Sequence, residues 1–396
     1  GVQFNWRETS LTVAAQDHAV LVAISKYRDQ TRYPDLDGPL NDFKSFYSWL
    51  TSENGGDVPT ANIHYVTTDK PFVDLPDPRP DDAVYLTWEP SKRAFTTSLE
   101  KAIQDNRGNY VTRRGARLYM YFVGHGFSAD AELMESASLV PADVFGEQID
   151  DIPGTVYMEG IRKMALYSEI VLIMDCCRTL HRTGNYSRNV FGSYASGQAG
   201  KVSVLSVYAV PKDGSAQERD LTGTNQPVGL LTYSFLRALK EIRPDVLGRV
   251  LDTAIDQYLA MNWFKWYPDN KAPPKPMIYV PPAAQSRIYF RSFRPLIEQV
   301  FSVLQTRAED FALEIRSPNL SPIRGTFSAD KVHWERPGDY YSLLDIELSE
   351  PGPDGRQTFT LNLLSETYEI EFAQEPAPVP PRPRLTFTPG GARVDL

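Results

Sequence analysis

The sequence predicts an α/β fold whose mainly parallel sheet is flanked by helices, followed by a small all-β, sandwich-like domain at the C-terminal end. The first part is predicted because strands that are apolar along their whole length alternate with amphipathic helices, and such strands belong to parallel sheets covered on both faces. The second part is predicted because from about residue 291 the apolar residues alternate in period two between Pro-Gly and Asp-Gly turns.

The elements of the first part follow from the spacing of apolar residues. Continuous apolar runs predict buried strands at 18–25, 117–123, 169–174 and 202–209, and shorter runs predict strands at 63–66 and 277–280. Apolar side chains at helical spacing predict helices at 40–50, 91–106, 156–166, 230–242 and 246–258. Ser91 is the expected N-cap of its helix.

The C-terminal part contains short segments with strand-like alternation. They lie at 311–316, 340–348, 357–364 and 367–372, with a last one near 384–388 after a proline-rich piece. Asp354-Gly355 is the best hairpin signal among them. We therefore expect three parts: an N-terminal extension (1–14), an α/β domain (15–290) and a β-rich domain (291–396).

Composition limits the class of protein. The 396 residues carry a net charge of −9, which argues against nucleic-acid binding because phosphate contacts need a basic face. No apolar run is long enough for a membrane span, and the polar residues 1–10 are not expected to be a signal peptide. The two cysteines are adjacent, and neighbouring cysteines rarely form an unstrained disulfide. Free thiols predict a reducing, cytoplasmic location.

Two of the predicted core strands end in residues that can form a reactive pair. Strand 117–123 is followed by His125, and strand 169–174 is followed by Cys176 and Cys177. In open parallel sheets, functional groups collect beyond the carboxyl ends of the strands. A thiol needs a base or a lowered pKa to attack a carbonyl, and a neighbouring imidazole supplies either. The pattern predicts a Cys–His catalytic pair.

These two motifs resemble those of the caspase-like cysteine peptidases. Residues 121–126 (YFVGHG) look like the family's strand-and-histidine motif, and residues 174–178 (MDCCR) look like its nucleophile motif, which in metacaspases reads Asp, any residue, Cys. His125 precedes Cys177 by 52 residues, and the caspase histidine lies about 50 residues before its cysteine. The resemblance covers about residues 15–290, because further segments match the first strand, the loop after it and a helix start in the small-subunit half: 18–25, 36–42 (LDGPLND) and 229–233 (GLLTY).

The resemblance implies a cysteine endopeptidase mechanism. Cys177 is the implied nucleophile, because it follows an aspartate by two residues, and Cys176 is then a small apolar filler. His125 is the implied base, and the backbone N–H groups of Gly126 and Cys177 are the implied oxyanion hole. The sequence offers no third catalytic residue; in this family the third group is often a backbone carbonyl or absent. The surroundings of the cysteine point to metacaspases and prokaryotic relatives rather than to caspases.

Substrate specificity is also implied by the resemblance. Asp42 and Asp175 match family positions that line the first substrate pocket of metacaspases, and two carboxylates would hold a guanidinium or an ammonium group. The expected cleavage is therefore after Arg or Lys. Val123 stands where the family often has a small polar residue, which leaves the choice between Arg and Lys open. The two aspartates could instead serve only as caps for neighbouring elements.

Regulation is expected from the loop after the nucleophile. Arg178, Arg182 and Arg188 lie in a stretch that is cut during maturation in caspase relatives, so they are candidate self-cleavage sites; the alternative is a basic surface loop. No cofactor or resident metal is expected. Some metacaspases need calcium, but the acidic clusters of this chain lack the spacing of a calcium loop: Asp77, Asp81, Asp82, Asp150 and Asp151.

Two alternatives remain from the sequence. Cys176 and Arg182 stand in the Cys-x₅-Arg frame of cysteine phosphatases, but Asp175 would repel phosphate and no glycine-rich cradle leads into a helix. The other alternative is a catalytically silent caspase-fold scaffold that binds partners through its β domain. The expected partners of the peptidase are proteins with exposed Arg or Lys sites and an activating protease or signalling partner, with no nucleic acid and no membrane. By analogy with prokaryotic relatives, a role in stress or antiviral defence signalling is expected.

Overall fold

The computed structural model divides into two compact units. One comprises Ala14–Ala238 and Asp252–Gln285, and the other comprises Gly1–Val13, Leu239–Leu251 and Ser286–Leu396. The predicted domain limits remain a prediction. The residues described are 16–68, 90–104, 114–128, 136–146, 149–180, 199–221, 223–266, 275–280, 288–294, 296–304, 311–317, 320–327, 331–334, 346–347, 352–353, 356–364, 368–374 and 384–387.

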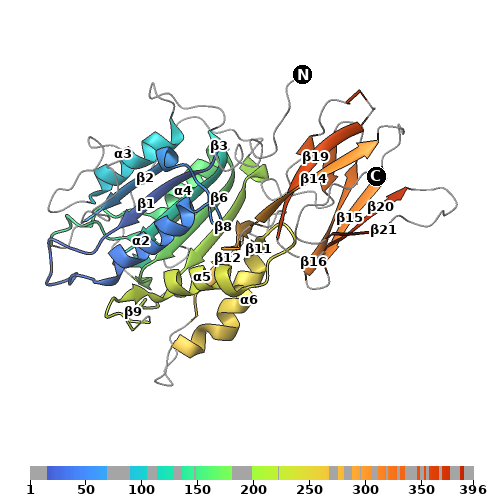
Figure 1. The fold of residues 1–396 in the computed structure, drawn as a ribbon. Coiled ribbons are helices and arrows are strands. Elements are labelled where there is room, and N and C mark those ends of the chain that lie inside the picture. The colour runs from blue at the N-terminus through green and yellow to red at the C-terminus, as the bar shows by residue number, and fades with distance from the viewer. Residues whose placement is uncertain are drawn as a thin grey trace. The chain divides into compact units, whose positions relative to one another are not determined.

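A six-stranded, mainly parallel sheet forms the centre of the first unit (Figure 1). Five strands run parallel and one edge strand, β12, is antiparallel to its neighbour β8. The predicted mixed α/β class with helices beside a mainly parallel sheet is confirmed. In spatial order the strands are β12 (Met277–Tyr279), β8 (Ser203–Tyr208), β6 (Tyr167–Asp175), β3 (Gly115–Val123), β1 (His18–Ala23) and β2 (Ile63–Thr67).

Helices cover both faces of this sheet. Successive residues of a strand point to opposite faces, so a single strand contacts helices on both sides. Phe122 of β3 packs edge-on against Phe95 of α3 (Lys92–Ile103), at 5.5 Å between ring centroids. Its neighbour Tyr121 points the other way and stacks on Phe46 of α2 (Gly38–Thr51) at 4.3 Å. Two further helices complete the layers: α4 (Gly154–Met164), beside α3, and α5 (Leu230–Glu241), whose Thr232 hydroxyl lies 2.7 Å from that of Tyr121.

Helix starts follow local chemistry. The Ser91 side chain accepts a hydrogen bond from the Ala94 N–H at 3.2 Å, which confirms the predicted cap of α3. Proline in the first turn of α2 lacks an N–H that a helix start would leave unpaired in any case. Of these two helices, α2 carries the site residue Asp42.

One predicted helix is partly wrong. Within 246–258 the chain first forms strand β11 (Arg249–Leu251), paired with β13 (Tyr289–Arg291), and only then α6 (Asp252–Asn262) and the 3₁₀ turn η3 (Trp263–Trp266). Gly248 has φ of +73°, a left-handed conformation that ends any helical continuation from the preceding residues.

The second unit contains antiparallel strands, several of which match the predicted segments. Strand β14 pairs with β19, and six others form a sheet in the order β18-β17-β16-β15-β20-β21. A sandwich arrangement remains a prediction, and Asp354-Gly355 lies outside the described residues. The strands are β14 (Leu296–Leu304), β15 (Phe311–Ser317), β16 (Leu320–Phe327), β17 (Lys331–Trp334), β18 (Ile346–Glu347), β19 (Arg356–Leu364), β20 (Tyr368–Gln374) and β21 (Arg384–Phe387).

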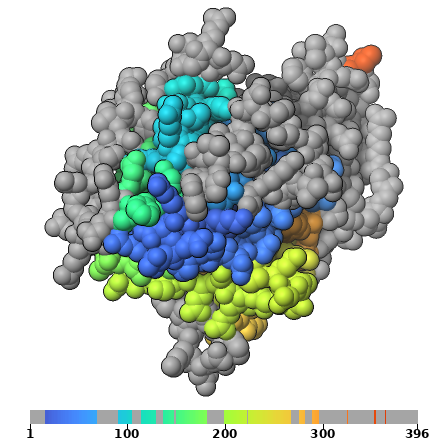
Figure 2. Space-filling model, turned by 90° about the vertical axis from the view of Figure 1, so that its left-hand side faces the viewer, coloured from blue at the N-terminus to red at the C-terminus, as the bar shows by residue number. Residues whose placement is uncertain are grey.

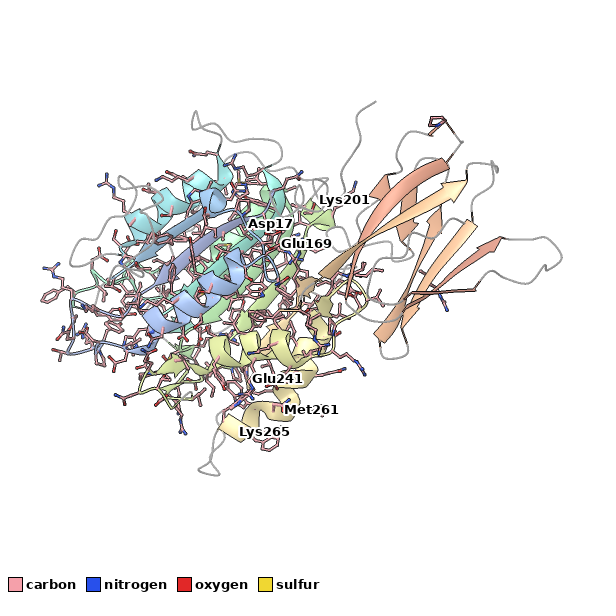
Figure 3. The ribbon with its side chains drawn as sticks, viewed as in Figure 1. Asp17, Glu169, Lys201, Glu241, Met261 and Lys265 are labelled. Carbon is pink, nitrogen blue, oxygen red and sulfur yellow. The ribbon has the colours of Figure 1, made fainter. Side chains whose placement is uncertain are left out.

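A buried ion pair lies near the amino ends of β3 and β6. Arg117 donates from Nε to the Glu169 carboxylate at 2.8 Å, and its backbone N–H donates to Asp17 at 3.1 Å. Figure 3 labels Asp17 and Glu169 at this end of the sheet. The pair therefore lies at the end of the sheet opposite to the candidate site described below.

No helix in the described part of the chain is both long and apolar enough to cross a membrane.

Candidate functional site

His125 and Cys177 lie opposite each other beyond the carboxyl ends of β3 and β6. The two strands pair in parallel with an offset of 52 residues, and the short strands β4 (Gly126–Ser128) and β7 (Thr179–Leu180) beyond them keep the same parallel offset. His125 and Cys177 share this offset, and each lies in the connector between its two strands. Adjacent strands lie about 5 Å apart. The two predicted catalytic residues are therefore brought together.

The imidazole of His125 is held by the segment that follows β1. Its Nε2 lies 2.8 Å from the carbonyl oxygen of Pro34. A carbonyl oxygen only accepts hydrogen bonds, so Nε2 carries the proton and the neutral ring keeps its lone pair on Nδ1. The ring packs against both Tyr27 and Tyr33, at centroid distances of 4.9 Å and 5.7 Å, and the two tyrosine rings lie 6.0 Å from each other. Nδ1 is consequently the basic atom available to a thiol.

The Cys177 thiol is half-buried and faces the segment before β9 (Glu218–Arg219). Its Sγ accepts a hydrogen bond from the Ala216 N–H at 3.2 Å. Burial raises the pKa of Cys177 above its ordinary value, and the charge of Asp175 raises it further, while the Ala216 N–H lowers it. Burial lowers the pKa of His125, against the opposing effects of Pro34 and Glu218. Both shifts favour a neutral thiol beside a neutral imidazole at pH 7.

The neighbouring Cys176 is a packing residue. It is 1% exposed, it belongs to the apolar core, and burial raises its pKa well above the ordinary value. A β-carbon at Gly126 would lie 2.5 Å from its Sγ, so only glycine fits beside this thiol. Cys176 is thus inaccessible as a nucleophile, which removes the thiol that the phosphatase alternative requires.

The aspartates Asp42 and Asp175 are both buried and meet at Gly229. A β-carbon at Gly229 would lie 2.6 Å from Oδ2 of Asp42 and 2.5 Å from Oδ2 of Asp175, so the two carboxylates are close neighbours. Asp42 accepts from the Gly229 N–H at 2.7 Å and 2.9 Å. Asp175 accepts from the N–H and the hydroxyl of Thr232 at 2.9 Å and 2.7 Å. These donors belong to the start of α5, where backbone N–H groups favour negative charge.

The acid pair is nevertheless electrostatically unfavourable. Burial raises the pKa of Asp175 to about 6, and it raises the pKa of Asp42 well above the ordinary value, with a further increase from the Asp175 charge. Within the described ranges, the hydrogen bonds to the pair come from the neutral groups of Gly229 and Thr232. The pair therefore retains a proton to a higher pH than an exposed carboxylate would, and a cation would relieve the repulsion.

Glu218 is a third carboxylate at this site, which the sequence analysis did not identify. It lies on β9, opposite Gly229 of β10 (Val228–Gly229). Its carboxylate accepts from the N–H groups of Asp37 and Gly38 at 3.2 Å and 2.7 Å, at the start of α2. Figure 2 shows blue residues of the chain's first part lying against yellow-green residues from after position 200. Its charge raises the pKa of both aspartates and of His125.

The remaining predicted residues have mixed placements. Val123 is buried at the end of β3, in register with Asp175. The structure does not support self-cleavage after Arg178. This side chain is fully buried, donates to the carbonyl oxygens of Ser136 and Val210 and lies over a tyrosine ring, so it cannot enter a protease pocket in the folded chain. Arg182 and Arg188 lie outside the described residues.

Among the described residues, no three His, Cys, Asp or Glu side chains come together as a metal site. Asp150 pairs with Lys92 at 2.6 Å, and the pKa of its neighbour Asp151 is raised by burial. Asp77, Asp81 and Asp82 lie outside the described ranges.

The missed groups of the site give little sequence signal. The Pro34 contribution is a backbone carbonyl, which every residue type carries. Ala216 and Glu218 lie in a polar stretch without periodicity. The pairing of β9 with β10 and the backbone hydrogen bonds of Arg178 to Asp213 and Gly214 bring this stretch to the strand ends. Tyr27 occurs in a segment that reads as an ordinary loop.

Comparisons with known proteins add little. No protein-family model matches the chain, and no curated protein matches it. The solved structure of pro-sf-caspase-1 aligns over 67% of this chain and 87% of its own, at 11% identity and a TM-score of 0.35. A likeness of that size carries no argument, so the functional reading depends on the geometry of the site.

Proposed function

We propose that the chain is a cysteine endopeptidase of the caspase/metacaspase kind that cleaves proteins after Arg or Lys. The observation that supports this proposal is the placement of His125 and of the partly exposed Cys177 on adjacent connectors, at the same end of the sheet as a buried pair of carboxylates. A free cysteine without function is usually an inert core residue, as Cys176 is here. Cys177 differs from it in being partly exposed and in lying on the connector next to that of His125.

The proposed chemistry proceeds by acyl transfer. Nδ1 of His125 takes the proton of the Cys177 thiol as the sulfur attacks the substrate carbonyl carbon. The same proton then goes to the amine that leaves when the peptide C–N bond breaks. Water, deprotonated by Nδ1, hydrolyses the thioester and releases the acid. The carbonyl of Pro34 takes the part of an orienting third group, because it fixes the ring with Nδ1 free.

The oxyanion is assigned to the backbone N–H groups of Gly126 and Cys177. The support for this assignment is their position, since Gly126 begins β4 directly after His125 and Cys177 lies in the neighbouring connector between β6 and β7. Removing one donor from such a site typically raises the barrier by about 3–4 kcal/mol. Because the donors are backbone groups, substitution cannot delete them singly, and their role is tested through substrate analogues that form a tetrahedral adduct.

The acid pair is assigned to the substrate's basic side chain. A guanidinium or ammonium group beside Asp42 and Asp175 would supply the positive charge that these buried carboxylates require. Arg offers a planar fork of five donors, whereas Lys offers a point charge, so both remain candidate substrates. Val123 contributes an apolar wall in this proposal, not a hydrogen bond.

Several wider assignments belong to the same proposal. Self-cleavage is retained only for Arg182 and Arg188. A cytoplasmic location, protein partners with exposed Arg or Lys sites, an activating protease or signalling partner, and a role in stress or antiviral defence signalling follow from the family resemblance. No cofactor is assigned, and calcium activation is tested by adding the metal to the assay.

The first test is cleavage of fluorogenic peptides that end in Arg, Lys or Asp. We expect the wild-type chain to release the fluorophore after Arg or Lys, Cys177→Ala to be inactive, and Cys176→Ala to keep activity if it folds. Cleavage after Asp alone would contradict the acid-pair assignment. Activity that persists in Cys177→Ala and disappears in Cys176→Ala would contradict the nucleophile assignment.

The second candidate function is a silent scaffold that binds partners through its β domain. The lowered pKa of His125 and the raised pKa of Cys177 favour this candidate, because a neutral thiol is less nucleophilic than a thiolate. Absence of cleavage of every basic peptide, with and without calcium, together with unreactive Cys177 toward iodoacetamide, would favour this candidate over the peptidase.

A further inference from the structure

The hydroxyl group of Tyr27 connects the segment after β1 to the catalytic histidine of the proposed reaction. Tyr27 is fully buried. Its hydroxyl oxygen accepts a hydrogen bond from the backbone N–H of His125 at 2.7 Å, and its proton is donated to the carbonyl oxygen of Ile24 at 3.3 Å. The phenol therefore acts both as an acceptor, to the segment after β3, and as a donor, to the segment after β1.

This contact lies where the regular ladder between β1 and β3 ends. The last register pair is Ala23 with Val123, and the Ile24 N–H donates to the Val123 carbonyl at 3.0 Å. Gly124 then takes φ of +146° and turns the chain away from the sheet. The backbone N–H of the following residue has left the ladder, and the Tyr27 hydroxyl accepts from it in place of a strand carbonyl. Without this acceptor, the N–H group would lose its hydration on folding and gain no hydrogen bond in return, which would destabilise the folded state.

Gly124 and Tyr27 fit together at this turn. A β-carbon on Gly124 would lie 2.6 Å from the Tyr27 hydroxyl oxygen and 2.9 Å from the Ile24 carbonyl oxygen. The glycine therefore allows the backbone to approach the phenol closely enough for the hydrogen bond to His125. The turn at Gly124 and the side chain of Tyr27 therefore depend on each other.

Different groups fix the backbone and the ring of His125. The Tyr27 hydroxyl holds the backbone N–H, while Pro34 holds Nε2 and thereby sets the rotation of the imidazole. The Tyr27 ring also packs on the imidazole at 4.9 Å and an interplanar angle of 55°. The backbone N–H of Tyr27 donates to Asp35 at 3.2 Å, which ties the same segment together.

We propose that Tyr27 is a positioning residue that sets the place of the His125 imidazole relative to the Cys177 thiol. This inference rests on the proposed function, because it assigns Tyr27 a part in the same reaction. The phenol itself does not transfer protons, since burial raises its pKa well above the ordinary value. A displacement of about 1 Å in a catalytic group can lower a rate about a hundredfold.

The test is Tyr27→Phe, which keeps the ring and deletes the hydroxyl. We expect kcat for an Arg or Lys peptide to fall on the order of tenfold to a hundredfold, with KM changed less than about twofold. The control is Tyr119→Phe in the middle of β3, which deletes another buried hydroxyl, one that accepts from Arg117 at 2.9 Å. It should lose stability similarly and keep kcat.

Two further measurements separate this proposal from the proposed function. In the wild-type chain, the His125 amide should be protected from hydrogen exchange at least about tenfold relative to an unstructured amide; an unprotected amide would overturn the Tyr27 proposal whether or not Tyr27→Phe folds. The alkylation rate of Cys177 against pH should change in Tyr27→Phe and not in Tyr119→Phe. An unchanged kcat and an unchanged alkylation profile in folded Tyr27→Phe would also overturn it. A wild-type chain that cleaves no peptide contradicts the proposed function, and the exchange and alkylation results still decide the position of the imidazole.

Discussion

At the scale of single residues, the site depends on glycines that leave room for charged and reactive groups. Gly229 approaches both aspartates so closely that its N–H bonds to Asp42, and Gly126 lies against the thiol of Cys176. A methyl group at Gly229 would occupy space that the site carboxylates fill, and one at Gly126 would occupy space that the packing thiol of Cys176 fills. Residue type is therefore constrained here by contact with functional groups and not by backbone conformation alone.

The first residue-scale prediction concerns Gly229→Ala. The added methyl would lie within 2.6 Å of both carboxylates, so at least one of them must move. We expect kcat/KM for Arg and Lys peptides to fall by about tenfold or more, mainly through KM, because the binding group is displaced and the nucleophile is not. Steady-state kinetics measure this, and alkylation of Cys177 should keep its wild-type rate.

Gly200→Ala is the matched control for this change. Nothing lies within 4 Å of a β-carbon at Gly200, so the same substitution should leave the kinetics unaltered. Equal losses in both variants would indicate a general effect on folding. An unaffected KM in Gly229→Ala would show that the acid pair does not bind the substrate's side chain.

At the scale of elements, short strands and helix starts assemble the site. Strands β9 and β10 bring Glu218 and Gly229 together, and the start of α2 provides the N–H groups that hold the Glu218 carboxylate. Asp42 lies on the same helix, so Glu218 acts both on the position of α2 and on the charge balance of the acid pair. Its charge also acts on His125.

The element-scale prediction is a pH shift in Glu218→Gln. The Glu218 charge raises the pKa of His125, Asp42 and Asp175, so its removal should lower all three. In the proposed mechanism the His125 base must be neutral and the acid pair ionised, so activity should be lost on the acidic side. We expect the acidic limb of the kcat/KM profile to move to lower pH in the variant.

Asp256→Asn is the control for this profile. It removes an exposed carboxylate of α6 that pairs with Lys275 at 3.4 Å. The same change in net charge should leave the acidic limb in place. A limb that moves equally in both variants, or moves upward in Glu218→Gln, would contradict the local role of Glu218.

The same scale shows what could be predicted from the sequence. The long core strands and the helices at 40–50 and 230–242 were predictable, because their apolar spacing is continuous over many residues. The position of His125 opposite Cys177 also followed from strand ends. The strands of two or three residues, such as β4, β7 and β9, were not predictable, because their pairing depends on contacts between distant parts of the chain.

The contributions of Tyr27, Pro34 and Glu218 were missed for a related reason. Pro34 acts through its backbone, and Tyr27 acts on the backbone of His125, so side-chain patterns carry no information about either. The burial of Arg178 was likewise unpredictable, because a basic residue in a polar stretch is usually exposed. Its place is set by the carbonyl oxygens that surround it.

At the scale of the whole molecule, the two ends of the central sheet have opposite electrostatic properties. At the amino ends of the strands, Arg117 and Glu169 neutralise each other in the core. At the carboxyl ends, Asp42 and Asp175 are buried with neutral donors. The charges of Arg117 and Glu169 balance each other within the chain. The acid pair has no cationic partner among its hydrogen-bond donors in the described residues, and the basic side chain of the proposed substrate would supply one.

This contrast predicts how stability depends on pH. In the unfolded chain Asp175 loses its proton near 3.8, whereas in the folded chain burial raises its pKa to about 6. Between these values the unfolded state binds fewer protons, so the free energy of unfolding should fall as pH rises through this window. The shift corresponds to a loss on the order of 3 kcal/mol at neutral pH.

Asp175→Asn should therefore stabilise the protein at pH 8 and inactivate it toward Arg and Lys peptides. The amide oxygen can still accept from Thr232, while the repulsion with Asp42 disappears. Urea titrations at pH 5 and pH 8 should show a smaller pH dependence of the unfolding free energy in the variant than in the wild type.

Glu169→Gln, the same kind of substitution at the other end of the sheet, should destabilise the protein at both pH values, because it leaves Arg117 buried without its charged partner. If Asp175→Asn is less stable than the wild type at pH 8, the ionised aspartate stabilises the fold as a cap for α5. That outcome would contradict the proposal that its charge binds a cationic substrate.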